Sequence, residues 1–326
     1  MKTILALAVL VVLLPAGVRA GQGLRRLDLR CPPPERPVEA PPLSDEARRE
    51  MEAKLAAARA DYEKSPDDAD AIIWLGRRTA YLGRFREAVR IFSEGVEKHP
   101  RDARMYRHRG HRYITLRCFD LAAEDLGRAA RLVENRPDEV EADGLPNARN
   151  TPTSTLKTNV FYHLGLAHYL KGDFARARAA FRECVRFSKN ADMLAAASHW
   201  LYATLRRTGR AEEARRLLEA FDGEAEVIEN HDYRRLLLMY KGRTTPERLL
   251  AEASGGGAKG LGYATTAYGV GAWYAYNGRP ERAVRVFLDV LETRQATSFG
   301  YIAAEAELRR MGVSPPAGLP DKTLHD

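Results

Sequence analysis

The apolar residues of this chain recur at the spacing of α-helices. Between Ser44 and Glu63, apolar side chains follow one another at steps of three or four residues, and Ser44 stands where a helix N-cap is expected. No stretch alternates apolar and polar residues in the way of a half-buried β-strand. The pattern therefore predicts an all-α protein.

The helical pattern repeats at a fixed period, and its clearest copy runs from Ala69 to Pro100. Small residues, which let two helices approach closely, stand at positions 8 and 20 of this copy, and phenylalanine stands at positions 17 and 24. Glycine at position 15 suits the left-handed residue that ends a helix, and proline at position 32 stops the next helix. These positions are held, in chain order, by Gly76, Gly83, Phe85, Ala88, Phe92 and Pro100.

Further copies begin near Ala103, Thr158, Ala195 and Ala264. The step from Ala103 to Thr158 is longer than the step from Ala69 to Ala103, and the surplus, 135–155, has no helical period. A loop of this length inside a compact domain is often functional. A degenerate copy precedes the last full one, and a final helix over 298–311 is expected to be left without a pairing helix.

This spacing resembles the tetratricopeptide repeat, a helix–turn–helix unit of about 34 residues, over roughly residues 69–311. The resemblance implies a right-handed α-solenoid, because one such unit cannot bury its apolar face without neighbours. It also implies binding of a protein or peptide and scaffolding of assemblies, without catalysis. The chain is similar in this respect to exported bacterial tetratricopeptide repeat proteins, many of which have no assigned function.

The segment 1–20 predicts export. Lys2 supplies a positive start, an unbroken apolar run extends from Ile4 to Leu14, and Ala20 ends a small-x-small cleavage site. The run is too short to span a membrane. We therefore divide the chain into a signal peptide (1–20), a proline-rich arm (21–42), a leading helix with repeats 1 and 2 (43–134), an inserted loop (135–155), repeats 3 and 4 with the degenerate repeat, the last full repeat and the end helix (156–311), and a tail (312–326).

Composition leaves the partner open. The 326 residues are 45% hydrophobic and 29% charged, with a formal net charge of +8. Two of the basic residues, Lys2 and Arg19, belong to the expected signal peptide, so the exported chain has a charge of +6. Its arginines are spread along the helices. They form either a solvated surface or a groove that attracts acidic partners.

Three cysteines occur in the expected exported chain. Cys184 stands at a packing position of the third repeat and is expected to be a buried thiol. Cys31 and Cys118 would be able to pair in an oxidising compartment, but an odd number of cysteines defines no disulfide framework. Both the paired and the unpaired state of these two residues stay open at this point.

No motif predicts catalysis, a cofactor or a metal. The glycine-rich stretch from Ser254 to Gly260 lacks the Gly-Lys-Ser/Thr order and the preceding strand of a phosphate-binding loop. His108 and His111 are three residues apart on one helix, but no third ligand lies near them in the sequence. We therefore expect a protein that is not an enzyme.

The resemblance implies a binding groove, because the first helix of each repeat lines the concave face through positions 2, 5, 9, 12 and 13. Arginine and tyrosine dominate these positions. Arginine binds carboxylates as a planar fork, and both residue types are enriched at binding hot spots. The expected contact residues are Arg77, Tyr81, Arg104, Arg107, His111, Asn159, Tyr162, Tyr169, His199, Arg206, Tyr268 and Tyr276.

Three hypotheses follow for the function. The leading one is an adaptor or scaffold of the cell envelope, periplasmic or secreted, that binds a protein or peptide, possibly acidic in character, in this arginine- and tyrosine-lined groove. The second is a structural component that self-associates. The third is a ligand-binding or enzymatic site at the inserted loop, 135–155. We expect no nucleic-acid partner and no membrane span.

Overall fold

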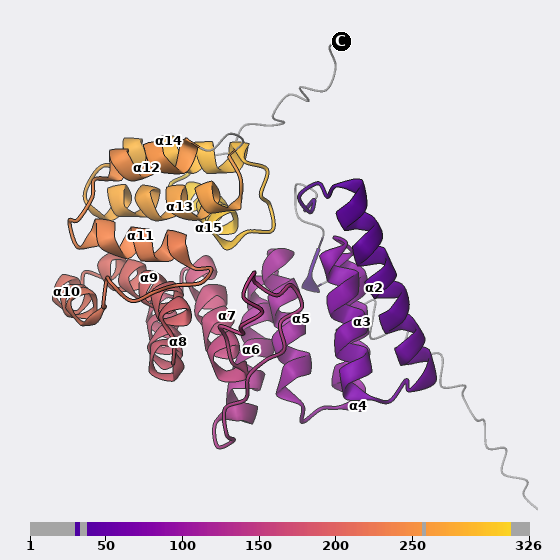
Figure 1. The fold of residues 1–326 in the computed structure, drawn as a ribbon. Coiled ribbons are helices and arrows are strands. Elements are labelled where there is room, and N and C mark those ends of the chain that lie inside the picture. The colour runs from indigo at the N-terminus through magenta and orange to yellow at the C-terminus, as the bar shows by residue number, and fades with distance from the viewer. Residues whose placement is uncertain (1–29, 33–37, 256–258, 314–326) are drawn as a thin grey trace, which may run out of the picture.

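The computed structural model describes residues 30–32, 38–255 and 259–313. The expected signal peptide and nearly all of the expected tail lie outside these described residues. Fourteen helices, labelled α2 to α15 in Figure 1, make up the described part. They are α2 (Asp45–Lys64), α3 (Ala69–Tyr81), α4 (Phe85–Lys98), α5 (Ala103–Thr115), α6 (Phe119–Val133), α7 (Leu156–Lys171), α8 (Phe174–Phe187), α9 (Ala191–Arg207), α10 (Ala211–Ala220), α11 (His231–Tyr240), α12 (Pro246–Ser254), α13 (Leu261–Tyr276), α14 (Pro280–Glu292) and α15 (Phe299–Arg310).

Consecutive helices pair and stack into an α-solenoid, so the all-α fold expected from the sequence is confirmed. α3 packs on α4, α5 on α6, α7 on α8 and α13 on α14, and α2 covers α3 at the N-terminal end. The side chain of Ser44 caps α2 by accepting a hydrogen bond of 3.2 Å from the Ala47 amide. The fourth repeat begins at Ala191, one turn before the expected Ala195.

Glycine at position 8 of a repeat lets its two helices touch. A Cβ atom on Gly76 would lie 2.5 Å from the ring of Phe92, and one on Gly165 would lie 2.5 Å from the ring of Phe181. The same relation, at the same sequence spacing, recurs at Gly110 with Leu126 (2.7 Å) and at Gly271 with Phe287 (2.6 Å). All four large side chains are buried, with at most 1% of their surface exposed. The same packing contact is therefore made in four repeats, which explains why glycine recurs at this repeat position.

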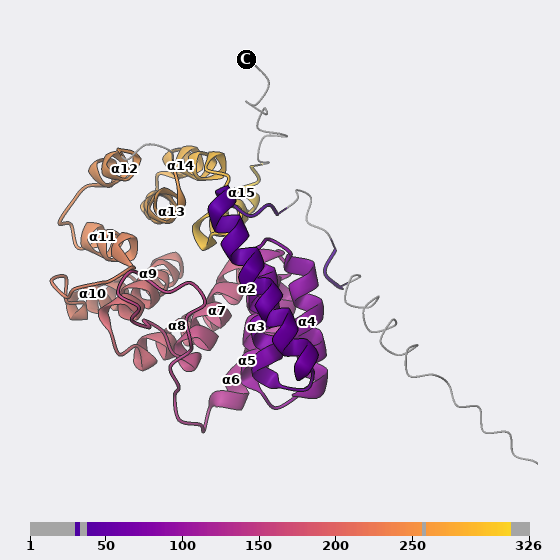
Figure 2. The same cartoon turned by 45° about the vertical axis from the view of Figure 1, so that its right-hand side comes forward.

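The solenoid curves until its last helix meets its middle. α15 packs on α13 and α14 and also on α7, and Figure 2 shows how the arc brings this end back towards α5 and α7. The guanidinium group of Arg310 donates a hydrogen bond of 3.0 Å to the Leu170 carbonyl, and Arg207 forms an ion pair of 2.6 Å with Glu307. Among the described residues no helix follows α15, which agrees with the expectation that it lacks a pairing helix of its own; its apolar side chains are buried against α7, α13 and α14 instead.

The turn of the second repeat is tied to α15. Arg117 occupies the left-handed turn position, with φ of 64°, where other repeats have glycine. Such a conformation costs roughly 1–2 kcal/mol for a residue with a Cβ. Its side chain reaches Glu305 of α15 in an ion pair of 2.8 Å. The arginine thus serves as a link across the arc that glycine would not supply.

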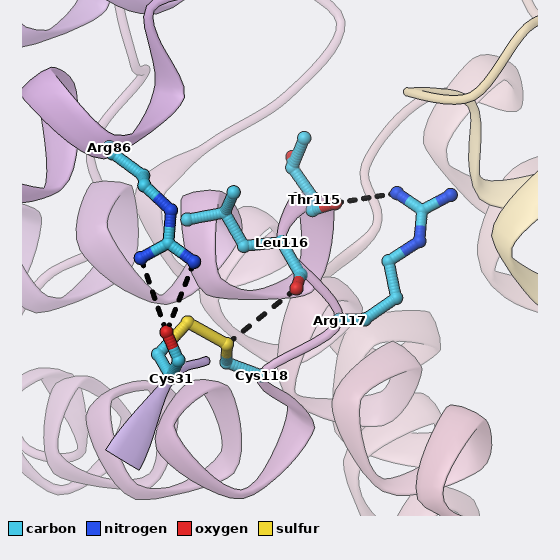
Figure 3. Close-up of a disulfide and its surroundings, with 6 residues drawn as sticks. All are labelled: Cys31, Arg86, Thr115, Leu116, Arg117 and Cys118. Carbon is cyan, nitrogen blue, oxygen red and sulfur yellow. Dashed lines mark hydrogen bonds between the residues drawn. A yellow bond between two sulfur atoms is a disulfide. The ribbon is translucent and has the colours of Figure 1, made fainter. Parts of the chain in front are cut away.

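A disulfide joins the residue after this turn to the N-terminal arm. Cys31 and Cys118 are bonded, with their Cα atoms 5.4 Å apart and a sequence separation of 87. Figure 3 shows Arg86 of α4 donating hydrogen bonds of 3.1 and 3.2 Å to the Cys31 carbonyl. The question that the sequence left open is settled in favour of the pair. The third cysteine, Cys184, is a buried thiol as expected, and burial raises its pKa.

Two glycine-to-alanine substitutions are predicted to act in opposite directions. Gly165→Ala forces a Cβ atom onto Phe181 and is expected to lower the free energy of unfolding by about 1–3 kcal/mol. Gly127→Ala on α6 places its Cβ in nearly open space, 3.7 Å from the nearest Arg131 atom. It is expected to raise that free energy by roughly 0.5–1 kcal/mol, because alanine is the better helix former. Urea denaturation of both variants measures the signs; equal effects would contradict this packing account.

Candidate functional site

The inserted loop is fixed at its base beside the start of α7. Val140 and Thr155 form an isolated antiparallel bridge, and the Leu156 amide donates a hydrogen bond of 2.8 Å to the Glu139 carbonyl. The carboxylate of Asp138 accepts hydrogen bonds from the Thr155 hydroxyl at 2.8 Å and from the Lys157 amide at 3.1 Å. From this base the loop runs across α5, α6 and α7 (Figure 1).

The carboxylate of Glu141 enters a pocket between α5 and α7. It lies 3.2 Å from Arg107 Nε and 3.3 Å from His108 Nε2, and it accepts a hydrogen bond of 2.9 Å from the Asn159 amide group. The side chains of Glu141, Arg107 and His108 are only 9%, 11% and 5% exposed. A buried carboxylate is therefore surrounded by three donor side chains from two helices.

The hydrogen bonds define the tautomer of His108. An Arg107 guanidinium nitrogen, which can only donate, lies 2.9 Å from His108 Nδ1. Nδ1 is thus the acceptor, and in the neutral ring Nε2 carries the hydrogen; Nε2 lies 3.3 Å from Glu141 Oε1 without forming a hydrogen bond to it. Burial, followed by the charge of Arg107, lowers the pKa of His108 well below its usual value, which agrees with a neutral ring.

The next residues of the loop lie on α3. Arg77 donates a hydrogen bond of 2.8 Å to the Ala142 carbonyl, and Arg78 donates one of 2.9 Å to the Gly144 carbonyl. A Cβ atom on Gly144 would lie 2.0 Å from the Tyr81 hydroxyl oxygen, so the backbone approaches α3 as closely as glycine allows. We call residues 139–144 the docked segment and the surface of α3 and α5 beneath it the arginine face.

Of the expected contact residues, four touch the docked segment: Arg77, Tyr81, Arg107 and Asn159. Arg104 lies on α5 and forms ion pairs with Asp70 of α3 (2.5 Å) and with Asp102 (2.6 Å). His111 faces α7 and α15, with its ring centroid 4.3 Å from that of His163 and 5.5 Å from that of Phe299. The structure thus gathers Arg77, Tyr81, Arg107 and Asn159 around the loop, whereas Arg104 and His111 have other partners.

The expected residues of the later repeats lie elsewhere. Tyr162, Tyr169, His199 and Tyr268 are buried, with 6%, 0%, 0% and 1% of their surface exposed, and offer no surface to a partner. The hydroxyl groups of the three tyrosines form hydrogen bonds inside the core, where that of Tyr268 donates to that of Tyr169 at 2.8 Å. The concave positions of α7, α9 and α13 are core positions here because the closing arc packs these helices against one another and against α15.

The two remaining expected residues lie at the helix ends beside this core. Arg206 donates hydrogen bonds to the Tyr202 hydroxyl (2.9 Å) and to the Asn277 side chain (2.8 Å), and it lies over the ring of Tyr276 at 5.2 Å. They interact with each other and lie apart from the arginine face, so the expected site is divided.

Sequence reasoning missed four residues of the site: Arg78, His108, Glu141 and Gly144. Arg78 and His108 stand at repeat positions 10 and 6, outside the set taken as concave. Glu141 and Gly144 lie in the loop, whose path has no periodicity to predict it. The acidic start of the loop, opposite a chain rich in arginine, was the one available signal.

Cationic groups outnumber anionic ones behind the docked segment. Arg77, Arg107 and Arg112 lie near the buried imidazoles of His108, His111 and His163, and the carboxylates that act on Arg107 there are those of Glu141 and Asp143. Burial lowers the pKa of Arg112 to about 10 and, with the neighbouring arginine charges, lowers the pKa values of the three histidines. The arginine face is therefore suited to an acidic chain.

Neither a metal site nor a membrane helix is found in the part of the chain that the structure describes. No three histidine, cysteine, aspartate or glutamate side chains there are grouped so as to hold a metal ion. None of the described helices is both long and apolar enough to cross a membrane. The expectation of no cofactor stays a prediction.

Comparisons with known proteins identify the repeat. Residues 159–187 match a family model described as tetratricopeptide repeat. The chain is similar in fold to YrrB, described as a TPR protein with an unusual peptide-binding site, at 16% identity and a TM-score of 0.41 over 78% of this chain and 98% of that chain. It is also similar to a tetratricopeptide repeat protein from Parabacteroides merdae, at 13% identity and a TM-score of 0.45 over 87% and 99%. No curated protein matches the sequence.

The buried histidines predict a loss of stability in acid. Burial lowers the pKa of His199 to about 3, so the folded chain leaves this ring neutral where the unfolded chain protonates it. Below pH 6.5 the unfolded state binds more protons, and the free energy of unfolding falls by about 1.4 kcal/mol per pH unit for each such histidine.

Urea unfolding between pH 7.5 and pH 5 measures this slope. His199→Phe removes one titrating group and is expected to make the fall shallower by about 1.4 kcal/mol per pH unit below pH 6. The matched control is Trp273→Phe, an aromatic substitution that removes no titrating group and should leave the slope unchanged. An equal slope in the wild type and in His199→Phe would contradict the prediction.

Proposed function

Because the chain is built of tetratricopeptide repeats, we propose that it is a non-catalytic protein-binding scaffold of the cell envelope, periplasmic or secreted. Solenoid proteins present extended concave surfaces to their partners. In this chain the inner surface that carries polar groups along two adjacent repeats is the arginine face of α3 and α5. We infer that a partner protein binds there with an extended, acidic segment.

One observation supports this surface above the others. The arginine face binds a stretch of extended chain, namely the docked segment, through two backbone carbonyls and one carboxylate. Hydrogen bonds from arginine to carbonyls hold any extended backbone, whereas the pocket formed by Arg107, His108 and Asn159 selects a carboxylate. These are the contacts of a peptide on a protein surface, and they favour protein binding over the enzymatic hypothesis.

The proposed location has two supports. Residues 1–20 have the composition of a signal peptide. The bond between Cys31 and Cys118 is of the kind that persists in oxidising compartments such as the periplasm, where thiols are not kept reduced. Both features agree with a chain that folds after export.

Photo-crosslinking in the intact cell envelope tests the proposed surface. A photo-reactive residue at position 78, on the arginine face, is expected to give an adduct with one defined protein. The same residue at position 215, on the outer helix α10, should give none. Changing Arg77 and Arg107 to Glu in the position-78 protein is expected to abolish the adduct, because the charge of the surface is reversed. Equal adducts at positions 78 and 215, or an adduct that survives the double change, would refute the assignment.

A further inference from the structure

The docked segment is held on the arginine face almost entirely by polar contacts. Val140 within the segment and Leu145 next to it are 66% and 53% exposed, and they are two of the three exposed large hydrophobic residues among the described part of the chain. Segments that bury little apolar surface open at low free-energy cost. The loop therefore covers the arginine face without being part of the hydrophobic core.

The loop is anchored on both sides of this segment. Its base is fixed by the bridge between Val140 and Thr155, and its far side is tied to the connection between α10 and α11. There, Arg149 pairs with Glu226, and Thr153 donates a hydrogen bond to Glu229. Residues 141–146 span the two anchors, so this part is able to leave the face while the anchors stay in place.

We propose that the docked segment is an internal ligand, which occupies the partner site until an acidic, extended peptide of the partner displaces it. This inference rests on the proposed function and adds its regulation and the chemistry of the partner. The segment shows what the face accepts: a carboxylate for Arg107, His108 and Asn159, two carbonyls for Arg77 and Arg78, and a glycine beside Tyr81 three residues after the carboxylate.

A partner has more surface available than the loop uses. Arg78 also lines a cleft of about 520 Å³ between α2 and α3, and the other side chains there are of both charges: Lys54 and Lys64, the carboxylates of Asp61, Asp68 and Asp70, and the ring of Trp74. Gly144 is the last loop residue that bonds to α3, and no residue of the loop lines this cleft. A peptide that continues past the glycine would reach the cleft and gain contacts there. This difference gives a longer partner an advantage over the tethered segment.

The advantage matters because the tethered segment competes at a high local concentration, in the millimolar range for short flexible linkers. A free peptide that repeats only residues 136–147 would therefore bind the intact protein poorly. If the docked state is populated ten to one, releasing the loop raises the apparent affinity for such a peptide by about tenfold.

The experiment uses a fluorescent peptide of residues 136–147 and measures its binding by anisotropy. Three variants of the full chain release the loop in different ways. Glu141→Lys puts a cation beside Arg107, Gly144→Val collides with Tyr81, and a third variant replaces residues 139–144 with a Gly-Ser linker. Each is expected to bind the peptide at least about tenfold more tightly than the wild type does. Gly127→Ala serves as the matched control and should bind like the wild type.

Further controls tie the binding to the arginine face. In the linker variant, Arg107→Gln is expected to abolish binding, and a peptide carrying Glu141→Gln and Gly144→Val should not bind. Circular dichroism and thermal melting check that each variant is folded, and the three release variants substitute for one another if one of them fails to fold.

Each outcome supports or overturns the inference. Failure of all folded release variants to bind the peptide would show that the docked segment is only a structural strap. Equal affinity of wild type and release variants would show that the loop does not occupy the site. Either result, together with an adduct at position 78, would refute the internal-ligand proposal while still supporting the proposed function. Tighter peptide binding by the release variants, without any adduct at position 78, would refute the proposed function instead.

Discussion

The close contact between a glycine and a large side chain, made within four of the repeats, is the constraint on which the structure depends. In four repeats the backbone of one helix rests directly on the side chain of the next, as Gly76 does on Phe92. A solenoid multiplies such a geometry, because every repeat is rotated by a small angle against its neighbour. The contact fixes the shape of the repeated unit, and the stacking of such units gives the curvature that brings α15 back to α7 in this chain.

Closure of the arc decides which inner residues are able to bind. Arg117 and Arg310 link α15 to the turn of the second repeat and to α7, and the tyrosines of the later repeats are enclosed between helices. What stays open on the inner side is the arginine face of repeats 1 and 2. There the excess of guanidinium groups is met by the carboxylate of Glu141 and the carbonyls of the docked segment. Both the closure of the arc and the distribution of charge thus favour the arginine face as the binding surface.

The sequence predicts the repeating part of the structure and misses what lies outside the repeat. Helix bounds and close contacts such as that of Gly165 with Phe181 follow from the repeat period, since each position has a mechanical reason. The path of the inserted loop does not follow, because Glu141 finds its partners through tertiary contact alone. Of the residues assigned to the concave face, Arg77 contacts the loop, whereas Tyr268 is buried in the core. Its error was the assumption of an open groove, which local pattern cannot test.

The disulfide illustrates the same limit. Cys31 and Cys118 have a sequence separation of 87, and only the folded arm brings them together. The bond fastens the arm to the turn that carries Arg117, next to the link with α15. The disulfide and the Arg117–Glu305 ion pair, which join distant parts of this chain, are thus single side-chain contacts. The helix-pair contacts, which recur along the chain, follow the repeat period.

A distance measurement between the loop and the solenoid tests the central claim most directly, namely that the docked segment rests on the arginine face and yields to an acidic chain. Spin labels at positions 145 and 97, both exposed, allow pulsed electron paramagnetic resonance on the full protein. The account predicts one narrow distance distribution in the free protein, which becomes longer and broad when an acidic peptide extending into the α2–α3 cleft saturates the site. A broad distribution in the free protein, or a narrow one that saturating peptide leaves unchanged, would contradict it.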